Sequence, residues 1–423
     1  MSLNRKITAL ILCLFIVLSG VLTTSCGKSD ETPGKTEKST DGFSDDQTDE
    51  IDRELERIKA EIEDEIRGEM SEELLEELRQ QLASGGLNPS AKPFLNVADY
   101  VQPDTGKDVS DEIQMVINKN PGRTIYFPDG VYVIGKPILT SANPKSSVSL
   151  YLSANAVLKA IDGWRESEAM VRLGALENFN TIYINGSNYY FYGGTVDGNG
   201  RADGISIDSG RETAIRGVNI KDVRTGIIVK RGANNGSSDS DVRDVTITGN
   251  GISGSTGIKI YGADNTFTNI DIYGMDTGLF IKSGGNMFRE IRAEYTFREG
   301  LEPVGYDQTV GFNASGGTNW FDSCSSDNYA TGFLVNSSTV IYRMCSVSWS
   351  SDSCNSYEKA FDCYGMFRST IISPTVRFRE DASQRSLLTV EDEGGKGVLQ
   401  NPIFDESLCD DDTYKNYILK SEE

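Results

Sequence analysis

The sequence predicts an all-β fold, a parallel β-helix (solenoid) in which short strands wind into successive coils. The first observation is a recurrent segment in which a glycine opens a short apolar strand, as in TGIKI (256–260) and TGLFI (277–281). The second is a motif between these strands, read in NTFTNIDI (265–272), that repeats aromatic and apolar residues in register. The third is the spacing of the motifs, often 21 or 22 residues, which is typical of a solenoid.

A short export segment precedes the fold. Arg5 and Lys6 are followed by an apolar stretch, 7–22, that is too short for a comfortable membrane span. The sequence LTTSC, which ends at Cys26, resembles the lipobox of bacterial lipoproteins, in which the cysteine is lipidated after cleavage. We therefore interpret residues 1–25 as a lipoprotein signal peptide and expect an exported protein, anchored to the membrane at the cell surface by a lipid on Cys26. An ordinary cleaved signal is the alternative, and it also predicts export.

Two polar segments separate Cys26 from the solenoid. Residues 26–50 are charged and nearly devoid of large apolar side chains, so we expect a disordered tether. Residues 51–83 repeat apolar side chains every three or four positions, which predicts a helical spacer. The strict heptad fails after Ile62, which favours a solvated helix, with self-association through the spacer as the alternative. Residues 27–82 carry 20 acidic and 8 basic side chains, more than half of the net charge of −22.

The β-helix domain is expected over residues 93–423. It opens with a predicted capping helix within 107–122, for which Asp108 or Ser110 would be the N-cap. GRTIYFPDGVYVIGKPILT follows and predicts two short strands around a Pro-Asp-Gly turn. The glycines that open the later repeat strands are Gly204, Gly226, Gly257, Gly278, Gly311 and Gly332.

The motif between the repeat strands predicts the core. Phe267, Phe288 and Phe321 occupy the same place in successive copies of it. Like residues of neighbouring coils stack about 4.8 Å apart in such a fold. We therefore expect these three rings to form a ladder inside the solenoid.

Composition excludes several classes of site. The chain has no histidine, which removes the commonest general base, the usual catalytic triads and most zinc sites. Beyond Cys13 and Cys26, 5 cysteines remain, and an odd number in a large exported domain is not a disulfide framework. No extended basic stripe is present, so we expect no nucleic-acid partner.

Three ordered motifs carry a resemblance to a known family. They are GRTIYFPDGVYVIGKPI (122–138), VSLYLSANAVLKA (148–160) and GGTVDGNG (193–200). From about residue 93 to 405 the chain resembles the pectin-lyase-like right-handed parallel β-helices, and within them the pectate-lyase-superfamily and polygalacturonase-like proteins. The resemblance implies a right-handed solenoid, whereas activity stays open because the superfamily includes lyases, hydrolases, epimerases, phage tailspikes and non-enzymes.

The catalytic sets of these relatives do not transfer to this chain. The polygalacturonase set needs a histidine and an Asp-Asp pair, but adjacent aspartates occur only in the tether and the C-terminal tail. The Asp-Asp-Gly-Phe-Asp calcium motif of one pectate lyase family is replaced by the sequence of residues 330–334, ATGFL. We therefore expect no metal and no cofactor, with Ca²⁺ as the exception if the protein is a lyase.

The glycine-rich stretch GGTVDGNGRADGISID (193–208) contains three aspartates. Asp197 falls in the family's turn motif, which predicts a structural role. Asp203 precedes a repeat glycine, where family hydrolases keep an acid, and Asp208 is predicted to point outward from its strand. We expect these two to bind substrate at a distant subsite of a long chain, with a purely structural role as the alternative.

Strand alternation predicts the exposed face of the repeat sheet. If the residue after each repeat glycine faces inward, the next faces outward. Aromatic rings can stack on sugar rings, and ammonium groups pair with carboxylates. The alternative is that outward positions are simply polar. The candidates on this face are Lys259 and Lys282 as catalytic residues and Lys230, Tyr261 and Phe280 as substrate-binding residues.

The largest polar expansion of the repeat is AEYTFREGLEPVGYDQ (293–308). Long turns on solenoids usually form the binding face, and we expect this one to overhang Lys259 and Lys282. Glu299 and Glu302 are the candidate catalytic acids in it, and Arg298 is a candidate for substrate binding. A solvated loop without function is the alternative.

These observations predict a carbohydrate-directed surface protein whose partner is a polysaccharide. One hypothesis is an enzyme, a lyase or a glycoside hydrolase acting on a uronate-containing polymer. The other is a non-catalytic glycan-binding or structural protein that lacks the family's catalytic residues. Whether the protein is an enzyme stays open at this point.

Overall fold

The computed structural model describes residues 94–141, 148–175, 189–232, 237–296, 308–336, 339–350, 357–392 and 394–419. The chain divides into two units, Met1–Ala91 and Lys92–Glu423, and all described residues belong to the second. The predicted signal peptide, tether and helical spacer, together with Cys26, lie outside the described residues. In the described part of the chain, no helix is both long and apolar enough to cross a membrane.

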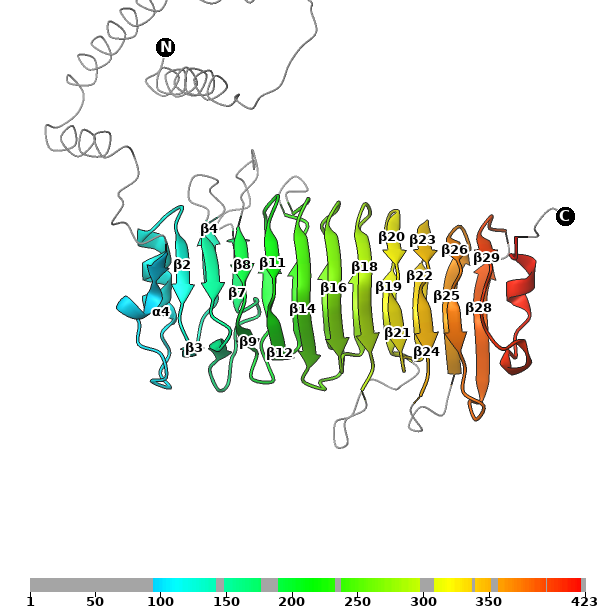
Figure 1. The fold of residues 1–423 in the computed structure, drawn as a ribbon, viewed down its shortest axis with the longest axis horizontal. Coiled ribbons are helices and arrows are strands. Elements are labelled where there is room, and N and C mark those ends of the chain that lie inside the picture. Colours follow the sequence, from blue (N-terminus) through cyan, green and yellow to red (C-terminus); the bar gives the residue numbers. More distant parts are fainter. Residues whose placement is uncertain are drawn as a thin grey trace, which may run out of the picture. The chain divides into compact units, whose positions relative to one another are not determined.

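The described unit is a parallel β-helix, built from two long sheets whose strands follow one another along its axis (Figure 1). The ten-stranded sheet contains β4 (Ile138–Ser141), β7 (Val171–Ala175), β10 (Ile205–Ile207), β13 (Thr225–Val229), β15 (Thr256–Ile260), β17 (Thr277–Ile281), β19 (Val310–Ala314), β22 (Thr331–Asn336), β25 (Tyr357–Met366) and β28 (Gln384–Asp392). Neighbours in this sheet pair in parallel, so each strand lies on the corresponding strand of the next coil.

The nineteen-stranded sheet forms the rest of each coil. Its strands are β1 (Leu95–Asn96), β2 (Thr124–Phe127), β3 (Gly130–Ile134), β5 (Ser149–Leu152), β6 (Ala156–Ala160), β8 (Tyr190–Tyr192), β9 (Thr195–Asp197), β11 (Ala214–Arg216), β12 (Asn219–Val223), β14 (Asp241–Gly249), β16 (Thr266–Tyr273), β18 (Met287–Glu294), β20 (Asn319–Asp322), β21 (Ser325–Asp327), β23 (Val340–Arg343), β24 (Ser346–Ser348), β26 (Thr370–Ile372), β27 (Thr375–Arg377) and β29 (Val398–Gln400). Its pairings are also parallel, as between β16 and β18.

The helices lie near the ends of the solenoid. The only α-helix among the described residues is α4 (Ser110–Lys119), and the 3₁₀ turns are η1 (Val97–Asp99), η5 (Glu406–Leu408) and η6 (Thr413–Asn416). The predicted capping helix is therefore present, but its N-cap is Val109 rather than Asp108 or Ser110. Asp108, one residue before this N-cap, nevertheless accepts the backbone N–H of Ser110 through its side chain at 3.0 Å. Gln114 ties the helix to β4 through both backbone groups of Leu139, at 2.8 and 2.9 Å.

The repeat glycines are required by close approach between coils. A Cβ on Gly257 would lie 2.6 Å from the carbonyl oxygen of Gly278 in the next coil, and one on Gly226 would lie 2.6 Å from that of Gly257. Real Cβ atoms do not approach backbone oxygens this closely. Stacked glycines thus allow the strands to begin at the same level in every coil.

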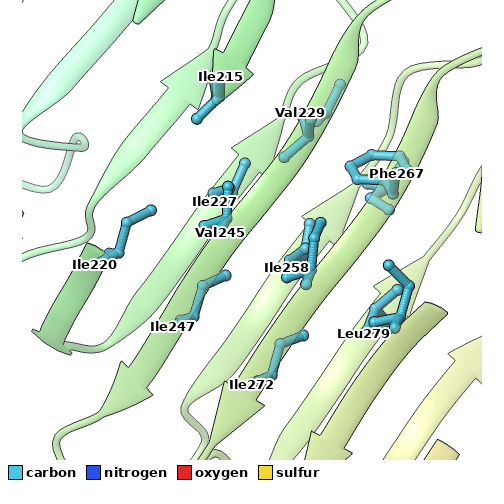
Figure 2. Close-up of a cluster of buried hydrophobic side chains, with 14 of the residues drawn as sticks. Ile215, Ile220, Ile227, Val229, Val245, Ile247, Ile258, Phe267, Ile272 and Leu279 are labelled. Carbon is cyan, nitrogen blue, oxygen red and sulfur yellow. The ribbon is translucent and has the colours of Figure 1, made fainter. Parts of the chain in front are cut away.

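The core consists of like residues stacked between coils. The rings of Phe267, Phe288 and Phe321 are buried and stack at centroid distances of 5.1 and 4.6 Å, so the predicted ladder is confirmed. Tyr342 extends it at 5.1 Å. Figure 2 shows aliphatic side chains of the two sheets facing the same interior, among them Ile227, Ile258 and Leu279 of the ten-stranded sheet. The described cysteines, Cys324, Cys345, Cys363 and Cys409, are free thiols.

A ladder of buried asparagines holds one corner of the coils. The side-chain oxygen of Asn286 accepts the backbone N–H of Asn265 at 3.1 Å, and that of Asn319 accepts the N–H of Asn286 at 3.2 Å. The side-chain amides continue the same chain of bonds, from Asn265 to Asn286 and from Asn286 to Asn319. Each asparagine thereby satisfies a buried donor that the turn leaves without a strand partner.

Candidate functional site

The outer face of the ten-stranded sheet carries two rows of side chains. The residue after each repeat glycine is buried, as Ile258 and Leu279 are, which confirms the predicted alternation. The middle row, defined by strand pairing, contains Arg172, Ser206, Ile228, Lys259, Phe280, Asn313, Leu334, Asp362 and Thr389. The end row follows the last strand positions and contains Asp208, Lys230, Tyr261, Lys282 and Ser315.

Asp208 lies at the centre of a charged cluster on this face. Its carboxylate accepts hydrogen bonds from Ser206 Oγ at 2.6 Å and from Arg172 Nε at 2.8 Å. Lys230 Nζ lies 3.2 Å from Asp208 Oδ1 and 2.5 Å from Glu168 Oε2. The side chain of Asp208 is only 7% exposed, so the cluster encloses this carboxylate and neutralises its charge.

Asp203 belongs to a second cluster, at the edge where the strands of this sheet begin. Arg224 binds its carboxylate with two hydrogen bonds, of 3.0 and 2.8 Å. Lys259 lies near this pair, and its Nζ donates to Thr225 Oγ1 at 3.2 Å. Burial lowers the pKa of Lys259 below its ordinary value of 10.5, and the charge of Arg224 lowers it further, while Asp203 partly opposes the shift.

The third group on this face is aromatic and cationic. The rings of Tyr261 and Phe280 meet edge to face at a centroid distance of 6.3 Å. Lys282 Nζ lies 5.1 Å from the centroid of the Phe280 ring, within the range of a cation–π contact. Tyr261 and Lys282 are exposed, so a ligand can reach both.

The structure revises part of the 293–308 expansion. Glu294 is the last residue of β18 and accepts from Arg292 at 2.9 Å, on the nineteen-stranded sheet. Tyr295 is buried, with its ring 5.7 Å from that of Tyr329. These two residues therefore belong to the body of the coil and not to a loop over the candidate site.

The remaining predicted residues of the expansion, Arg298, Glu299 and Glu302, lie outside the described residues. The segment that contains them rejoins the fold just before β19, at the edge where strands of the ten-stranded sheet begin. Lys259 bonds to Thr225 at that same edge, whereas Lys282 follows the last residue of β17. That the expansion overhangs both lysines stays a prediction.

Asp197 has the structural role expected of the turn motif. It ends β9 in the nineteen-stranded sheet, where its side chain accepts the N–H of Asn199 at 2.9 Å and lies 3.3 Å from Lys221 Nζ. Asn199 adopts a positive φ of 49°, as a tight turn requires. Asp197 thus lies on a different sheet from Asp203 and Asp208.

Sequence reasoning missed three residues of this face. Glu168 and Arg172 lie in the coil before the first repeat glycine, where Met170 stands at the position that Gly204 occupies in the next coil. Arg224 directly precedes the strand TGIIV, outside the motifs on which the sequence analysis relies. Aligning VRL (171–173) with ISI (205–207) would have placed Arg172 beside Ser206, as the structure does.

The residues present do not suit the calcium site of the related lyases. Ala330 and Thr331 stand where that motif has two aspartates, and neither offers a carboxylate. In the described part of the chain, no cluster of three or more Cys, Asp or Glu side chains could hold a metal ion.

Comparisons with known proteins agree with the fold. Residues 94–301 match the family described as rhamnogalacturonase A/epimerase, pectate lyase-like. No curated protein matches the chain.

Several solved structures are similar. The A-module of a mannuronan C-5 epimerase from Azotobacter vinelandii is 16% identical over 74% of this chain and 99% of its own, with a TM-score of 0.38. The tailspike of Escherichia coli bacteriophage HK620, solved with a pentasaccharide, is 12% identical over 74% and 66%, with a TM-score of 0.48. An alginate lyase from Paenibacillus sp. is 13% identical over 70% and 93%, with a TM-score of 0.43.

The family match and the architecture lead to one conclusion. The matched residues run from the first described residue through the coils that carry Asp203, Asp208, Lys259 and Lys282. Both sheets are parallel throughout the described residues, and the strands stack coil upon coil. The described residues form the parallel β-helix that the sequence predicts, and residues 94–301 are similar to the rhamnogalacturonase A/epimerase, pectate lyase-like family.

Proposed function

We propose that the outer face of the ten-stranded sheet binds a uronate-containing polysaccharide and that Lys259 removes the proton beside the uronate carboxylate. The observation that carries this proposal is the half-buried ammonium of Lys259, whose pKa is lowered by burial. A lowered pKa leaves more of the neutral amine at a given pH, and only the neutral amine can act as a base. The description of the matched family, which names a rhamnogalacturonase and an epimerase, is consistent with an acidic sugar chain.

The surroundings of Lys259 suit a negatively charged substrate. Arg224 is 47% exposed although it is bound to Asp203, so one edge of its guanidinium is accessible to a ligand. Lys282 is exposed beside Phe280 on the next coil. A uronate carboxylate near Arg224 would have its charge partly neutralised, which makes the adjacent carbon–hydrogen bond more acidic. Lys282 lies at the other end of the strands, where it would meet another sugar of the same polymer.

The chemical step balances without an added reactant. The Lys259 amine takes the proton from the carbon beside the carboxylate and becomes an ammonium. The electron pair left behind forms a carbon–carbon double bond as the glycosidic carbon–oxygen bond on the next carbon breaks. The leaving oxygen takes a proton from the Lys259 ammonium or from water, which completes an elimination. Return of a proton to the opposite face of the same carbon, without bond cleavage, would be an epimerisation.

Hydrolysis has less support from this geometry. A glycoside hydrolase needs two carboxyl groups, one to protonate the leaving oxygen and one to act as nucleophile or base. Asp203 and Asp208 are each bound by an arginine and largely enclosed. The same neutralised clusters favour non-catalytic glycan binding as the second candidate function.

The test uses three polymers: polygalacturonate, rhamnogalacturonan and alginate. Ultraviolet absorbance of an unsaturated uronate measures elimination, new reducing ends without that absorbance measure hydrolysis, and deuterium uptake from D₂O measures proton abstraction alone. We expect the double variant Lys259→Ala/Lys282→Ala to lose turnover by about 10²-fold or more at an unchanged melting temperature. Lys159→Ala, on the nineteen-stranded sheet, is the matched control and should keep full turnover.

A second double variant, Asp203→Asn/Asp208→Asn, separates the alternatives. It breaks ion pairs whose carboxylates are nearly buried, so we expect a lower melting temperature with turnover reduced less than in the lysine variant. Loss of turnover in the aspartate variant while the lysine variant stays active would place the chemistry on the carboxylates. Retention of a polymer by the wild type without any turnover would show a binding protein.

A further inference from the structure

We propose that the nineteen-stranded sheet carries a second polysaccharide-binding surface, an aromatic ladder separate from the Lys259 face. The ladder is defined as Phe94, Tyr126, Tyr151, Tyr190 and Tyr192. It rests on the proposed function in one respect, because the occupant we assign to it is the same class of acidic polysaccharide. It differs in its place in the fold, in its chemistry and in its role, which is to hold the polymer without acting on it.

Strand register places the rings on successive coils. Tyr126 pairs with Tyr151, and Tyr151 pairs with Tyr192, through the parallel strands β2, β5 and β8. Their ring centroids are 5.9 and 6.4 Å apart. Phe94 lies 6.2 Å from Tyr151 at an interplanar angle of 24°, and Tyr190 lies 5.7 Å from Tyr192 at 31°. Five rings therefore form one continuous strip along the axis of the solenoid.

The strip is accessible and is not part of the core. Phe94 is 48% exposed and Tyr151 is 44% exposed, and the other three rings are partly exposed. Most other aromatic residues at strand positions in the described chain are buried, as Phe267 and Phe288 are. Exposed rings gathered in one strip lose no core packing when they contact a ligand, and they offer it flat apolar faces with polar phenol edges.

The surroundings favour a sugar chain over a protein partner. Beside the ladder, Thr124 lies opposite Ser149 in the strand pairing, and Ser149 lies opposite Tyr190 in the next coil. Polar side chains therefore border the rings. Protein interfaces usually surround their aromatic residues with further apolar side chains in a well-packed core. A pyranose ring instead presents carbon–hydrogen groups on its face and hydroxyls at its rim, which matches rings bordered by hydroxyl groups.

Two exposed arginines at one end of the ladder can pair with the carboxylates of an acidic polymer. Arg216 pairs with Tyr192 in the next coil, and Arg243 pairs with Arg216 in the coil after that. Both arginines bind the same carboxylate, Asp241, at 2.5 and 2.6 Å. The two guanidinium groups are 41% and 47% exposed where the aromatic strip ends, although the carboxylate of Asp244 also acts on Arg243. A uronate residue continuing beyond the rings would meet these two arginines.

The two surfaces would act together on a long polymer. A chain held on the ladder stays close to the protein while another part of it meets the Lys259 face, which raises the effective concentration of substrate. The two surfaces lie on different sheets, so an oligosaccharide too short to pass from one sheet to the other contacts only one of them. The ladder should therefore affect retention of polymers and leave the turnover of short fragments unchanged.

The experiment measures retention of polygalacturonate, rhamnogalacturonan and alginate in affinity gels. The variants are Tyr151→Ala and Tyr126→Ala/Tyr151→Ala, with Tyr151→Phe to preserve the ring. Trp320→Ala is the matched control, since Trp320 is an exposed aromatic residue on the same sheet but several coils away. We expect the double variant to bind the retained polymer roughly tenfold more weakly, while Tyr151→Phe and Trp320→Ala bind it like the wild type.

The outcomes distinguish this inference from the proposed function. Turnover or deuterium uptake with short uronate oligosaccharides tests the Lys259 face alone and should be unchanged in the tyrosine variants. If the polymer retains the double variant as strongly as the wild type, the ladder proposal is overturned, even if the lysine variants lose activity. A changed oligomeric state of Tyr151→Ala, measured by light scattering, with unchanged polymer retention would instead identify a protein contact and would also overturn it. Failure of the wild type to be retained by any of the three polymers would overturn it as well.

Discussion

At the scale of single residues, the three lysines of the outward rows have different environments. Lys230 is bound to Asp208 and Glu168, whereas Lys282 is exposed beside an aromatic ring. Lys259 donates to a neutral hydroxyl and makes no ion pair with any described residue. Burial without a direct counter-ion is what lowers a lysine pKa, so these contacts single out Lys259 as the candidate base.

This difference predicts a pH dependence. The active form of Lys259 is the neutral amine, so the rate should rise with pH as its ammonium loses a proton. Because its pKa is lowered, the rise should occur at a lower pH than the ordinary lysine value of 10.5. Lys259→Arg keeps the charge but stays protonated, and it should lose the reaction while retaining polymer binding.

The measurement is the rate of deuterium uptake into a uronate substrate over a range of pH. Lys282→Arg is the control and should keep the shape of the wild-type profile. A wild-type rate that does not change with pH below the ordinary lysine range would contradict the role assigned to Lys259.

At the scale of the element, one coil is joined to the next by three kinds of ladder. Repeat glycines allow the strands of the ten-stranded sheet to begin close together, and stacked phenylalanines fill the interior. Buried asparagines accept the backbone N–H groups of Asn265 and Asn286, which directly precede β16 and β18. The motif NTFTNIDI contains both the asparagine and the phenylalanine, so each copy supplies a core ring and a hydrogen-bonding group at once.

The asparagine ladder gives a prediction about stability. Asn286→Ala removes the acceptor of the Asn265 N–H and the donor to Asn319 Oδ1, both of which are buried. A buried polar group left without a partner costs about 1–3 kcal/mol, so we expect the free energy of unfolding to fall by about that amount. Urea denaturation followed by circular dichroism measures it.

Asn219→Ala serves as the control, since Asn219 is an exposed strand residue of the same sheet. It should change the free energy of unfolding by no more than about 0.5 kcal/mol. Equal stability of Asn286→Ala and Asn219→Ala would mean that water replaces the ladder at no cost.

At the scale of the whole molecule, the β-helix is a unit of its own within residues 92–423. The expected lipid anchor at Cys26 and the two expected segments after it lie outside the described residues. If they have the properties that the sequence predicts, the solenoid is displayed on a tether at the cell surface. Both polysaccharide surfaces proposed above would then act on polymers outside the cell.

The anchor is tested by Cys26→Ser. The serine variant lacks the thiol that receives the lipid, so it should lose metabolic fatty-acid labelling and leave the membrane fraction. Cys13→Ser is the matched control and should keep both, because Cys13 lies inside the apolar stretch that precedes the cleavage site. Unchanged labelling of Cys26→Ser would exclude the lipobox interpretation and leave an ordinary cleaved signal.

Much of the fold could be predicted from the sequence because a solenoid turns sequence spacing into spatial contact. Residues one period apart must lie on neighbouring coils, as Phe267 and Phe288 do, whereas Phe321 was placed by the copy of the motif that contains it. Strand alternation also predicted that Lys259 and Lys282 lie on the outer face.

Tertiary structure decided what the spacing leaves open. Glu168 and Lys230 lie 62 residues apart and meet across coils, outside the repeat that the glycines define. Tyr126, Tyr151 and Tyr192 are separated by unequal intervals, because the connection between β7 and β8 adds residues to one coil. Periodicity carries information only where the period is constant. The burial that lowers the pKa of Lys259 depends on the volume and charge of all its neighbours, which no single spacing encodes.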